Sequence, residues 1–153
     1  MRFKPGTVLA CVLLQVIVGA VVADPAQATV DSLSSARLQY EDAVQAIDRG
    51  HWTEYQQLRS GLEDYPLAVY LDYNSLTRRV DKVRPPEAQR FLESSADTPL
   101  PNRFLSVYLH RAGKQRRWKD YLAVMPREPN SIELKCYYFR ARLAQGDRAA
   151  AWE

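Results

Sequence analysis

Apolar residues recur along most of the chain at intervals of three or four, the spacing of one face of an α-helix. The densest stretch, from Pro66 to about Val80, places five apolar residues in seven positions: Leu67, Val69, Tyr70, Leu71 and Tyr73. At 100° per residue these side chains cover far more than one narrow stripe. We therefore expect this helix to be buried on most sides, between the helix before it and those after it.

Six further helices are predicted by the same spacing, at Asp31–Gly50, Trp52–Leu62, Pro85–Leu92, Phe104–Gly113, Trp118–Leu122 and Asn130–Gly146. Asp31 and Asn130 are expected N-caps, because their side-chain oxygens can accept bonds from early backbone N–H groups. The glycines are expected stops, since glycine permits the left-handed turn that ends many helices. An eighth helix is expected from Asp147 to Glu153. No strand-length run alternates apolar and polar residues, so the fold class is all-α.

A weak repeat accompanies these turns. Gly50 precedes Trp52, Gly113 precedes Trp118 and Gly146 precedes Trp152, with 33 residues between the last two glycines and 34 between the last two tryptophans. That interval is typical of tetratricopeptide helix pairs, although short helical hairpins could also produce it by coincidence. Either way the sequence predicts stacked short antiparallel helices, forming a superhelical, tetratricopeptide-like solenoid segment.

Residues 1–28 have the layout of a secretory signal peptide. A short basic start is followed by an apolar run from Val8 to Val22 and by Ala26-Gln27-Ala28. Cleavage is expected after Ala28, with a cut after Ala23 as the alternative. The run is shorter than the roughly 20 residues of a membrane span, so no stable span is expected after cleavage. An uncleaved anchor is the competing interpretation.

Residues 29–153 are then expected to be the first part of a longer α-superhelical domain. A solenoid needs a polar capping repeat at its end, and none is recognisable here. The last seven residues would form a helix too short to be stable alone. We therefore expect the natural chain to continue past Glu153, with any catalytic domain in that continuation.

The net charge and the cysteine content limit the kinds of binding partner that the chain is expected to have. The leader holds two of the 21 basic and one of the 18 acidic residues, which leaves a near-balanced 19 and 17. Such balance does not suggest a dedicated polyanion binder, and nucleic acid is not expected for an exported chain. Cys11 lies in the leader, so Cys136 is the single cysteine of the mature chain. It is either a buried unpaired thiol or a residue whose disulfide partner lies beyond residue 153.

No residues form a recognisable catalytic, cofactor-binding or metal-binding constellation. His51 and His110 lie near helix ends and are interpreted as ordinary surface residues. The adjacent carboxylates of Glu41-Asp42 and of Glu63-Asp64 point to different helix faces, so neither pair alone builds a two-carboxylate glycosidase site. A basic cluster surrounds the predicted turn at Gly113 and is either a contact for an acidic polymer or a solvated turn: Arg111, Lys114, Arg116, Arg117 and Lys119.

Asp64-Tyr65-Pro66-Leu67, followed by Tyr70-Leu71 and Tyr73, resembles the N-terminal helical region of the soluble lytic transglycosylases. The likeness extends to the helix around Tyr40, to Trp118, to Cys136-Tyr137-Tyr138 and to the turn before Trp152. Members of that family are periplasmic enzymes that cleave peptidoglycan glycan strands and leave 1,6-anhydromuramic acid ends. Their N-terminal superhelix of short helices curls into a ring, on which a lysozyme-like catalytic domain sits.

The resemblance implies a periplasmic, non-catalytic N-terminal segment of such an enzyme, which meets glycan strands through the full-length protein. Family members use one glutamate in a Glu-Ser-x-aromatic context. Glu93-Ser94-Ser95 is followed by Ala96, so we do not assign that role to Glu93. No catalytic, cofactor-binding or metal-ligating residue is expected here. The alternatives are a free-standing periplasmic tetratricopeptide-like module that binds a protein partner, and a helical domain tethered by an uncleaved leader.

Overall fold

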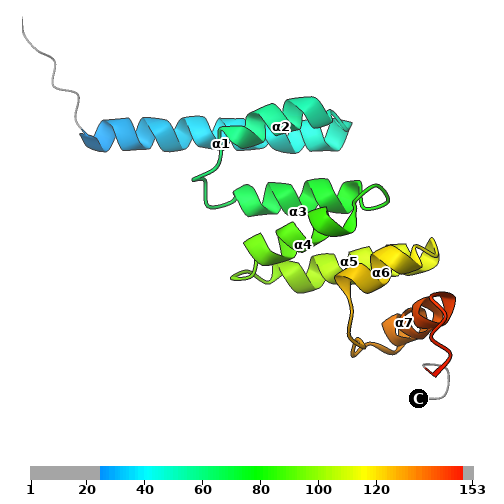
Figure 1. The fold of residues 1–153 in the computed structure, drawn as a ribbon. Coiled ribbons are helices and arrows are strands. Elements are labelled where there is room, and N and C mark those ends of the chain that lie inside the picture. The colour runs from blue at the N-terminus through cyan, green and yellow to red at the C-terminus, as the bar shows by residue number, and fades with distance from the viewer. Residues whose placement is uncertain (1–24, 150–153) are drawn as a thin grey trace, which may run out of the picture.

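The computed structural model describes the backbone of residues 25–149 and the side chains of residues 32–149. Within that range it contains seven α-helices and no strand (Figure 1), which confirms the all-α prediction. The helices are α1 (Pro25–Arg49), α2 (Trp52–Ser60), α3 (Ala68–Arg78), α4 (Pro85–Ser94), α5 (Leu100–Lys114), α6 (Trp118–Val124) and α7 (Ile132–Ala144). The predicted leader up to residue 24 and residues 150–153 lie outside the described part.

The helices stack in chain order, and successive helices run in opposite directions (Figure 1). The odd-numbered helices form one continuous layer, because α3 packs on α1, α5 on α3 and α7 on α5. In the second layer α4 packs on α5 and α6, and α6 packs on α7, whereas α2 packs on α1. The predicted stacked solenoid is confirmed. α3 lies between earlier and later helices as expected, with α1 on one side and α5 on the other, but it is not buried on most sides.

A regular interval relates the even-numbered helices. Trp52, Pro85 and Trp118 are the first residues of α2, α4 and α6, so these helices begin 33 residues apart. The interval matches the predicted tetratricopeptide period. The interval separates the first residues of these helices, whereas the glycines used in the sequence analysis do not recur at it throughout.

Three turns at the ends of helices use a left-handed backbone residue: Gly50 (φ +74°), Arg116 (φ +55°) and Gly146 (φ +90°). After α1, the Gly50 N–H donates to the carbonyl of Ile47 at 3.1 Å and the His51 N–H donates to that of Ala46 at 2.8 Å. The same pair of bonds occurs after α5 and after α7. These bonds satisfy carbonyls that the helix end leaves open.

Gly113 is not the stop that the sequence predicted. It lies in the last turn of α5, and Arg116 occupies the left-handed position instead. A Cβ at Gly113 would lie 2.4 Å from Cγ of Tyr137. Glycine is therefore needed there because the ring of α7 approaches the α5 backbone closely.

Several predicted helix boundaries are also wrong. Asp31 does not cap α1, because nothing in 25–31 interrupts the helix, which begins at Pro25. Pro66 lies in the turn before α3, which begins at Ala68. Asn130 is not the N-cap of α7, since Ser131 is the residue before the helix and no side chain caps it.

Apolar side chains form two adjoining cores. One lies between α1, α2 and the start of α3, and the other extends from the end of α3 to α7. In the second, the rings of Phe91 and Phe104 meet edge to face, with centroids 5.0 Å apart. The hydroxyl of fully buried Tyr121 donates to the Leu134 carbonyl at 2.8 Å, and burial raises the pKa of this tyrosine to about 12.

The buried face of α1 and α3 is narrower than predicted. Leu33 is 60% exposed, because the first half of α1 extends beyond α2 (Figure 1). Leu67 and Tyr70 are 45% and 40% exposed, while Leu71 on the same helix is fully buried. α3 thus has two packed sides and one open side.

The left-handed residues Arg116 and Gly50 predict opposite changes in the free energy of unfolding when they are substituted. Arg116→Gly should raise the free energy of unfolding by about 1 kcal/mol, because the Cβ of an L-residue is disfavoured at positive φ. Gly50→Ala should lower it by about the same amount for the same reason. Urea unfolding followed by circular dichroism measures both. A loss of stability in Arg116→Gly would contradict the assigned backbone strain.

The close approach of Tyr137 predicts that Gly113→Ala lowers the free energy of unfolding by about 1–3 kcal/mol through overpacking. Tyr137→Leu should relieve the clash, so the double variant should lose clearly less than the sum of the two single losses. A double-mutant cycle by urea unfolding tests this coupling. Strictly additive losses would show that the ring does not limit position 113.

Candidate functional site

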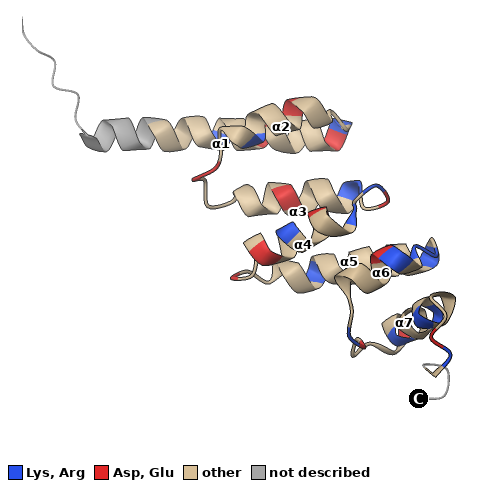
Figure 2. Ribbon diagram, in the orientation of Figure 1, with Lys and Arg blue, Asp and Glu red and all other residues tan. Residues whose placement is uncertain are grey.

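One side of the solenoid gathers three turns and the end of α7. We call it the turn edge, made of residues 50–51, 79–84, 115–117 and 145–147, and it lies on the right in Figure 1. Lys and Arg residues concentrate along it, as Figure 2 shows. The turns on the opposite side carry four acidic residues, Glu63, Asp64, Asp97 and Glu128, and one cation, Arg127. The turn edge is therefore basic, while the opposite edge carries acidic residues.

A tryptophan directly follows the turn edge at two places, each two residues after a left-handed position. Trp52 comes after Gly50 and begins α2, and Trp118 comes after Arg116 and begins α6. Both indole rings are partly buried and pack against the adjoining core. Each tryptophan also lines a surface hollow, and these hollows form the candidate site.

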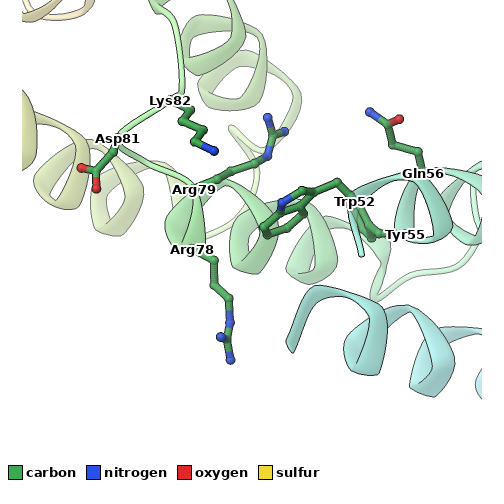
Figure 3. A pocket seen from close by; sticks show the side chains of 7 residues that line it. All are labelled: Trp52, Tyr55, Gln56, Arg78, Arg79, Asp81 and Lys82. Carbon is green, nitrogen blue, oxygen red and sulfur yellow. The ribbon is translucent and has the colours of Figure 1, made fainter. Parts of the chain in front are cut away.

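The Trp52 hollow has a volume of about 360 Å³ (Figure 3). α2 supplies one wall, and the end of α3 together with the α3–α4 turn supplies the other. Its lining residues are Trp52, Tyr55, Gln56, Arg78, Arg79, Asp81 and Lys82.

Most charges around the Trp52 hollow already have partners. Arg78 pairs with Asp48 at 2.5 Å, and Arg79 pairs with Glu87 at 2.5 Å. Asp81 points away from Trp52 in Figure 3 and pairs with Arg111, which lowers the pKa of its carboxyl group. Lys82 is the one lining cation without an ion-pair partner among the described residues. This hollow is close to electrically neutral.

A polar network connects α2 to α3 beneath the Trp52 hollow. The Arg59 guanidinium donates two bonds to the Asp72 carboxylate, Nε to Oδ1 at 2.9 Å and Nη2 to Oδ2 at 2.8 Å. The Tyr55 hydroxyl donates to the same carboxylate at 2.7 Å, and burial raises the pKa of this tyrosine. Bidentate pairs of this kind fix geometry as well as adding energy.

Trp118 lies in the wall of two neighbouring hollows, of about 400 and 590 Å³, which also share Arg116. Six cationic side chains line them: Arg117, which pairs with Asp120, and five others, Arg84, Lys114, Arg116, Lys119 and Arg140. Within residues 32–149, none of the five forms an ion pair with an acidic side chain. Asp120 also lines the smaller hollow, and its carboxylate is paired with Arg117 at 3.3 Å. The Trp118 hollows therefore carry uncompensated positive charge.

The predicted basic cluster divides into two groups in the structure. Arg111 pairs with Asp81, and Arg117 turns inward, where it donates to the carbonyls of Val83 at 3.1 Å and Val80 at 3.2 Å. Lys114, Arg116 and Lys119 instead border the Trp118 hollows. The sequence prediction missed Arg84 and Arg140, because they come from the α3–α4 turn and from α7.

Both histidines lie at the surface. His51 Nδ1 is 3.0 Å from the Glu54 carboxylate in the α1–α2 turn. On α5, His110 contacts the Ser106 carbonyl at 2.8 Å through Nδ1 and the Glu133 carboxylate at 3.1 Å through Nε2. Among the described residues, no three His, Cys, Asp or Glu side chains come together in a way that could hold a metal ion.

The carboxylates singled out from the sequence are all exposed. Glu41 and Asp42 lie on α1, Glu63 and Asp64 lie in the α2–α3 turn, and Glu93 lies in the last turn of α4. None of them lines the Trp52 or Trp118 hollows. The structure thus does not gather them at the turn edge.

Cys136 is exposed on α7 and free, so the interpretation as a buried thiol is wrong. The chain turns this side of α7 to solvent, whereas Leu134 and Tyr138 face the core. A disulfide to a cysteine beyond residue 153 stays a prediction. Among the described helices, none combines the length and the apolar character needed to cross a membrane.

Comparison with known proteins gives consistent matches over most of the chain. The soluble lytic murein transglycosylase of Salmonella typhimurium is 29% identical over 126 residues, which are 82% of this chain and 20% of that protein. The Escherichia coli K12 protein of the same name is 28% identical over the same length. This chain resembles one segment of the soluble lytic murein transglycosylases. It spans about a fifth of their length.

Solved structures of a lytic transglycosylase agree with the sequence match. The 70 kDa soluble lytic transglycosylase of Escherichia coli superposes with a TM-score of 0.66 at 27% identity, over 78% of this chain and 19% of that one. The complex of that 70 kDa enzyme with bulgecin A matches equally well. No family model matches the chain. The resemblance expected from Asp64 to Tyr73 is confirmed, as is the superhelical fold.

The network under the Trp52 hollow predicts that Asp72→Asn lowers the free energy of unfolding by about 1–2 kcal/mol, because two donors lose a charged acceptor. Asp48→Asn is the matched control. It removes an exposed ion pair with Arg78 and should cost less than about 0.5 kcal/mol. Urea unfolding of both variants gives the comparison. Equal losses would show that the Tyr55–Arg59–Asp72 network contributes no more than a surface pair.

Proposed function

We propose that this chain is the N-terminal, non-catalytic superhelical segment of a periplasmic soluble lytic transglycosylase. That enzyme would cleave the glycan strands of peptidoglycan and leave 1,6-anhydromuramic acid ends. The supporting observation is the sequence match to proteins of that name, in which the 126 matched residues make up 20% of the relative's length. The 70 kDa enzyme also has the same fold over this segment. The proposed periplasmic location also draws on the leader at residues 1–28.

The architecture suits a framework role. Stacked helix pairs of 33 residues extend in one direction, so the turns of successive pairs form a continuous edge. Repeat proteins commonly use such extended surfaces to bind long partners. A glycan strand is a long partner of that kind, and its sugars and carboxylates match the tryptophans and cations of the turn edge. The segment would shape the enzyme and help to hold the strand near a catalytic domain.

The carboxylates support a non-catalytic assignment. Glycoside cleavage needs a carboxyl group held in a defined environment near the scissile bond. Glu93 is exposed at the end of α4 and lies outside the hollows of the turn edge. The chemistry is therefore assigned to residues beyond this segment.

A free-standing tetratricopeptide-like module that binds a protein partner is the second candidate. The 33-residue interval between the starts of α2, α4 and α6 favours it, because this is the period of that repeat class. The two candidates differ in the part of the protein that each requires after residue 153. A transglycosylase requires a catalytic domain there, whereas a binding module does not.

The proposal predicts an open reading frame that continues several hundred residues past codon 153 and encodes a Glu-Ser-x-aromatic motif. The full-length product should clear a peptidoglycan-containing gel, and the 153-residue chain alone should not. DNA sequencing and zymography measure these two outcomes.

Two results would contradict the proposal. A stop codon directly after Glu153 would remove the catalytic domain and favour the binding module. Clearing of the gel by the 153-residue chain would show that this segment is itself catalytic. The matched control is the full-length protein in which the predicted downstream glutamate is replaced by glutamine. This variant should not clear the gel.

A further inference from the structure

The Trp118 hollows gather five cations that have no acidic partner among the described residues. Arg84, Lys114, Arg116, Lys119 and Arg140 come from the α3–α4 turn, α5, the α5–α6 turn, α6 and α7. Like charges brought together by five segments repel one another, so this arrangement does not stabilise the fold. Nearby Arg111 and Arg117 do stabilise it, through Asp81 and through backbone carbonyls.

Arg116 adds a second, independent observation. It occupies a left-handed position with φ +55°, where the equivalent turns after α1 and α7 have Gly50 and Gly146. A non-glycine residue at such a position is strained, and strain of this kind concentrates at functional sites. The Arg116 side chain is exposed and forms no hydrogen bond or ion pair with the described residues. The fold alone therefore gives no reason for an arginine there.

The chemistry of the hollows indicates the kind of ligand. Guanidinium groups match the planar geometry of a carboxylate and can donate two parallel bonds to it. An indole ring offers a flat apolar surface beside these donors, suited to the apolar face of a sugar ring. A polymer that repeats both features, sugar rings and carboxylates, fits better than a lone anion.

We propose that the Trp118 hollows bind a carboxylate-bearing glycan, namely a peptidoglycan strand whose stem peptides have been removed so that the lactyl carboxylates of its muramic acid units are free, with Arg116 as the central carboxylate contact. The identity of the polymer rests on the proposed function. Trp118 contacts the sugar face, and Arg84, Lys114, Lys119 and Arg140 supply further positive charge along the strand. All residues that line the two hollows lie between Arg84 and Gln145, within the described part of the chain.

The Trp52 hollow provides an internal comparison. It has a tryptophan in the same place relative to its turn, but Arg78, Arg79 and Asp81 are paired. If uncompensated charge determines binding, carboxylates should favour Trp118 over Trp52. If only an exposed indole matters, both should respond.

The test is a titration of the isotope-labelled 153-residue chain, monitored through the indole Nε1–H signals of its three tryptophans in a two-dimensional NMR spectrum. Trp118→Phe assigns the relevant signal. The probes are soluble glycan strands stripped of stem peptides, strands that keep them, the free stem peptide, and a chitin tetrasaccharide without carboxylates. We expect the Trp118 signal to shift most with the stripped strands, because stem peptides convert the lactyl carboxyl groups into amides, and we expect the Trp52 signal to shift less. An equal response to strands that keep their stem peptides would show that the lactyl carboxylates are not the groups recognised.

Arg116→Gly is the main variant, because it retains the turn geometry and should fold at least as well as the original chain. It should weaken strand binding by about three- to tenfold, the range expected for a partly exposed charge-assisted contact. Arg140→Gln should act in the same direction. Arg103→Gln is the matched control, since Arg103 is an exposed cation at the opposite end of α5 from Lys114 and has no ion-pair partner among the described residues. It should leave binding unchanged.

Several outcomes would overturn the site. Equal shifts with the chitin tetrasaccharide would show that carboxylates are not recognised. A response to the free stem peptide as strong as that to strands would show that the sugar is not recognised. Unchanged binding in Arg116→Gly would remove the central contact. These outcomes are separable from the proposed function: a stop codon after residue 153 leaves binding intact, and a silent Trp118 signal leaves the reading frame intact.

Discussion

The structure depends on one constraint: four of its seven described helices are too short to be stable without several neighbours. α6 has seven residues and α2 has nine, whereas isolated helices shorter than about 12 residues are marginal in water. α6 packs on α4, α5 and α7, which together bury Tyr121 completely. Each helix pair is therefore ordered by the next one. Because successive helices reverse direction, this stacking also brings every second turn to the same side and creates the turn edge.

Polar side chains connect one helix pair to the next where the apolar core divides. The core of α1 and α2 ends at the start of α3, and there Asp72 accepts bonds from Tyr55 and Arg59. Further along, Arg117 donates to the carbonyls of Val80 and Val83, which lie beyond the last hydrogen-bonded turn of α3. The Val80 carbonyl also accepts from the Val83 N–H at 3.4 Å, whereas Arg117 is the donor to the Val83 carbonyl. A buried carbonyl without a donor is costly, so this arginine has a structural task. The cations of the turn edge thus fall into two classes, those that hold successive pairs together and those that face solvent around Trp118.

Helix periodicity in the sequence was sufficient to predict seven helices, their order and their stacking, because each apolar face repeats over several turns. The candidate site was predictable only in part. Arg116 and Arg117 are adjacent and chemically identical, yet one points to solvent and the other inward, which depends on the left-handed turn between α5 and α6. Gly113 suggested that turn, but its role is contact with Tyr137 across the stack. Arg84 and Arg140 could not be assigned to the site, since only the fold brings them near Trp118.

A comparison of Trp52 with Trp118 shows which features of the turn edge are explained by folding and which are not. Trp52 and Trp118 occupy the same place in the 33-residue unit, and both pack partly into the adjoining core, so the fold explains their indole rings. Pro85 begins α4 at the corresponding place, which shows that stacking does not demand tryptophan there. The charges around the two rings differ more sharply. Ion pairs compensate every lining charge at Trp52 except Lys82, whereas five cations at Trp118 have no acidic partner among the described residues. A repeating scaffold keeps its packing positions similar and leaves the ends of its helix pairs free to vary. The unpaired cations therefore reflect a requirement other than folding, and their convergence from five segments makes that requirement specific to the assembled solenoid.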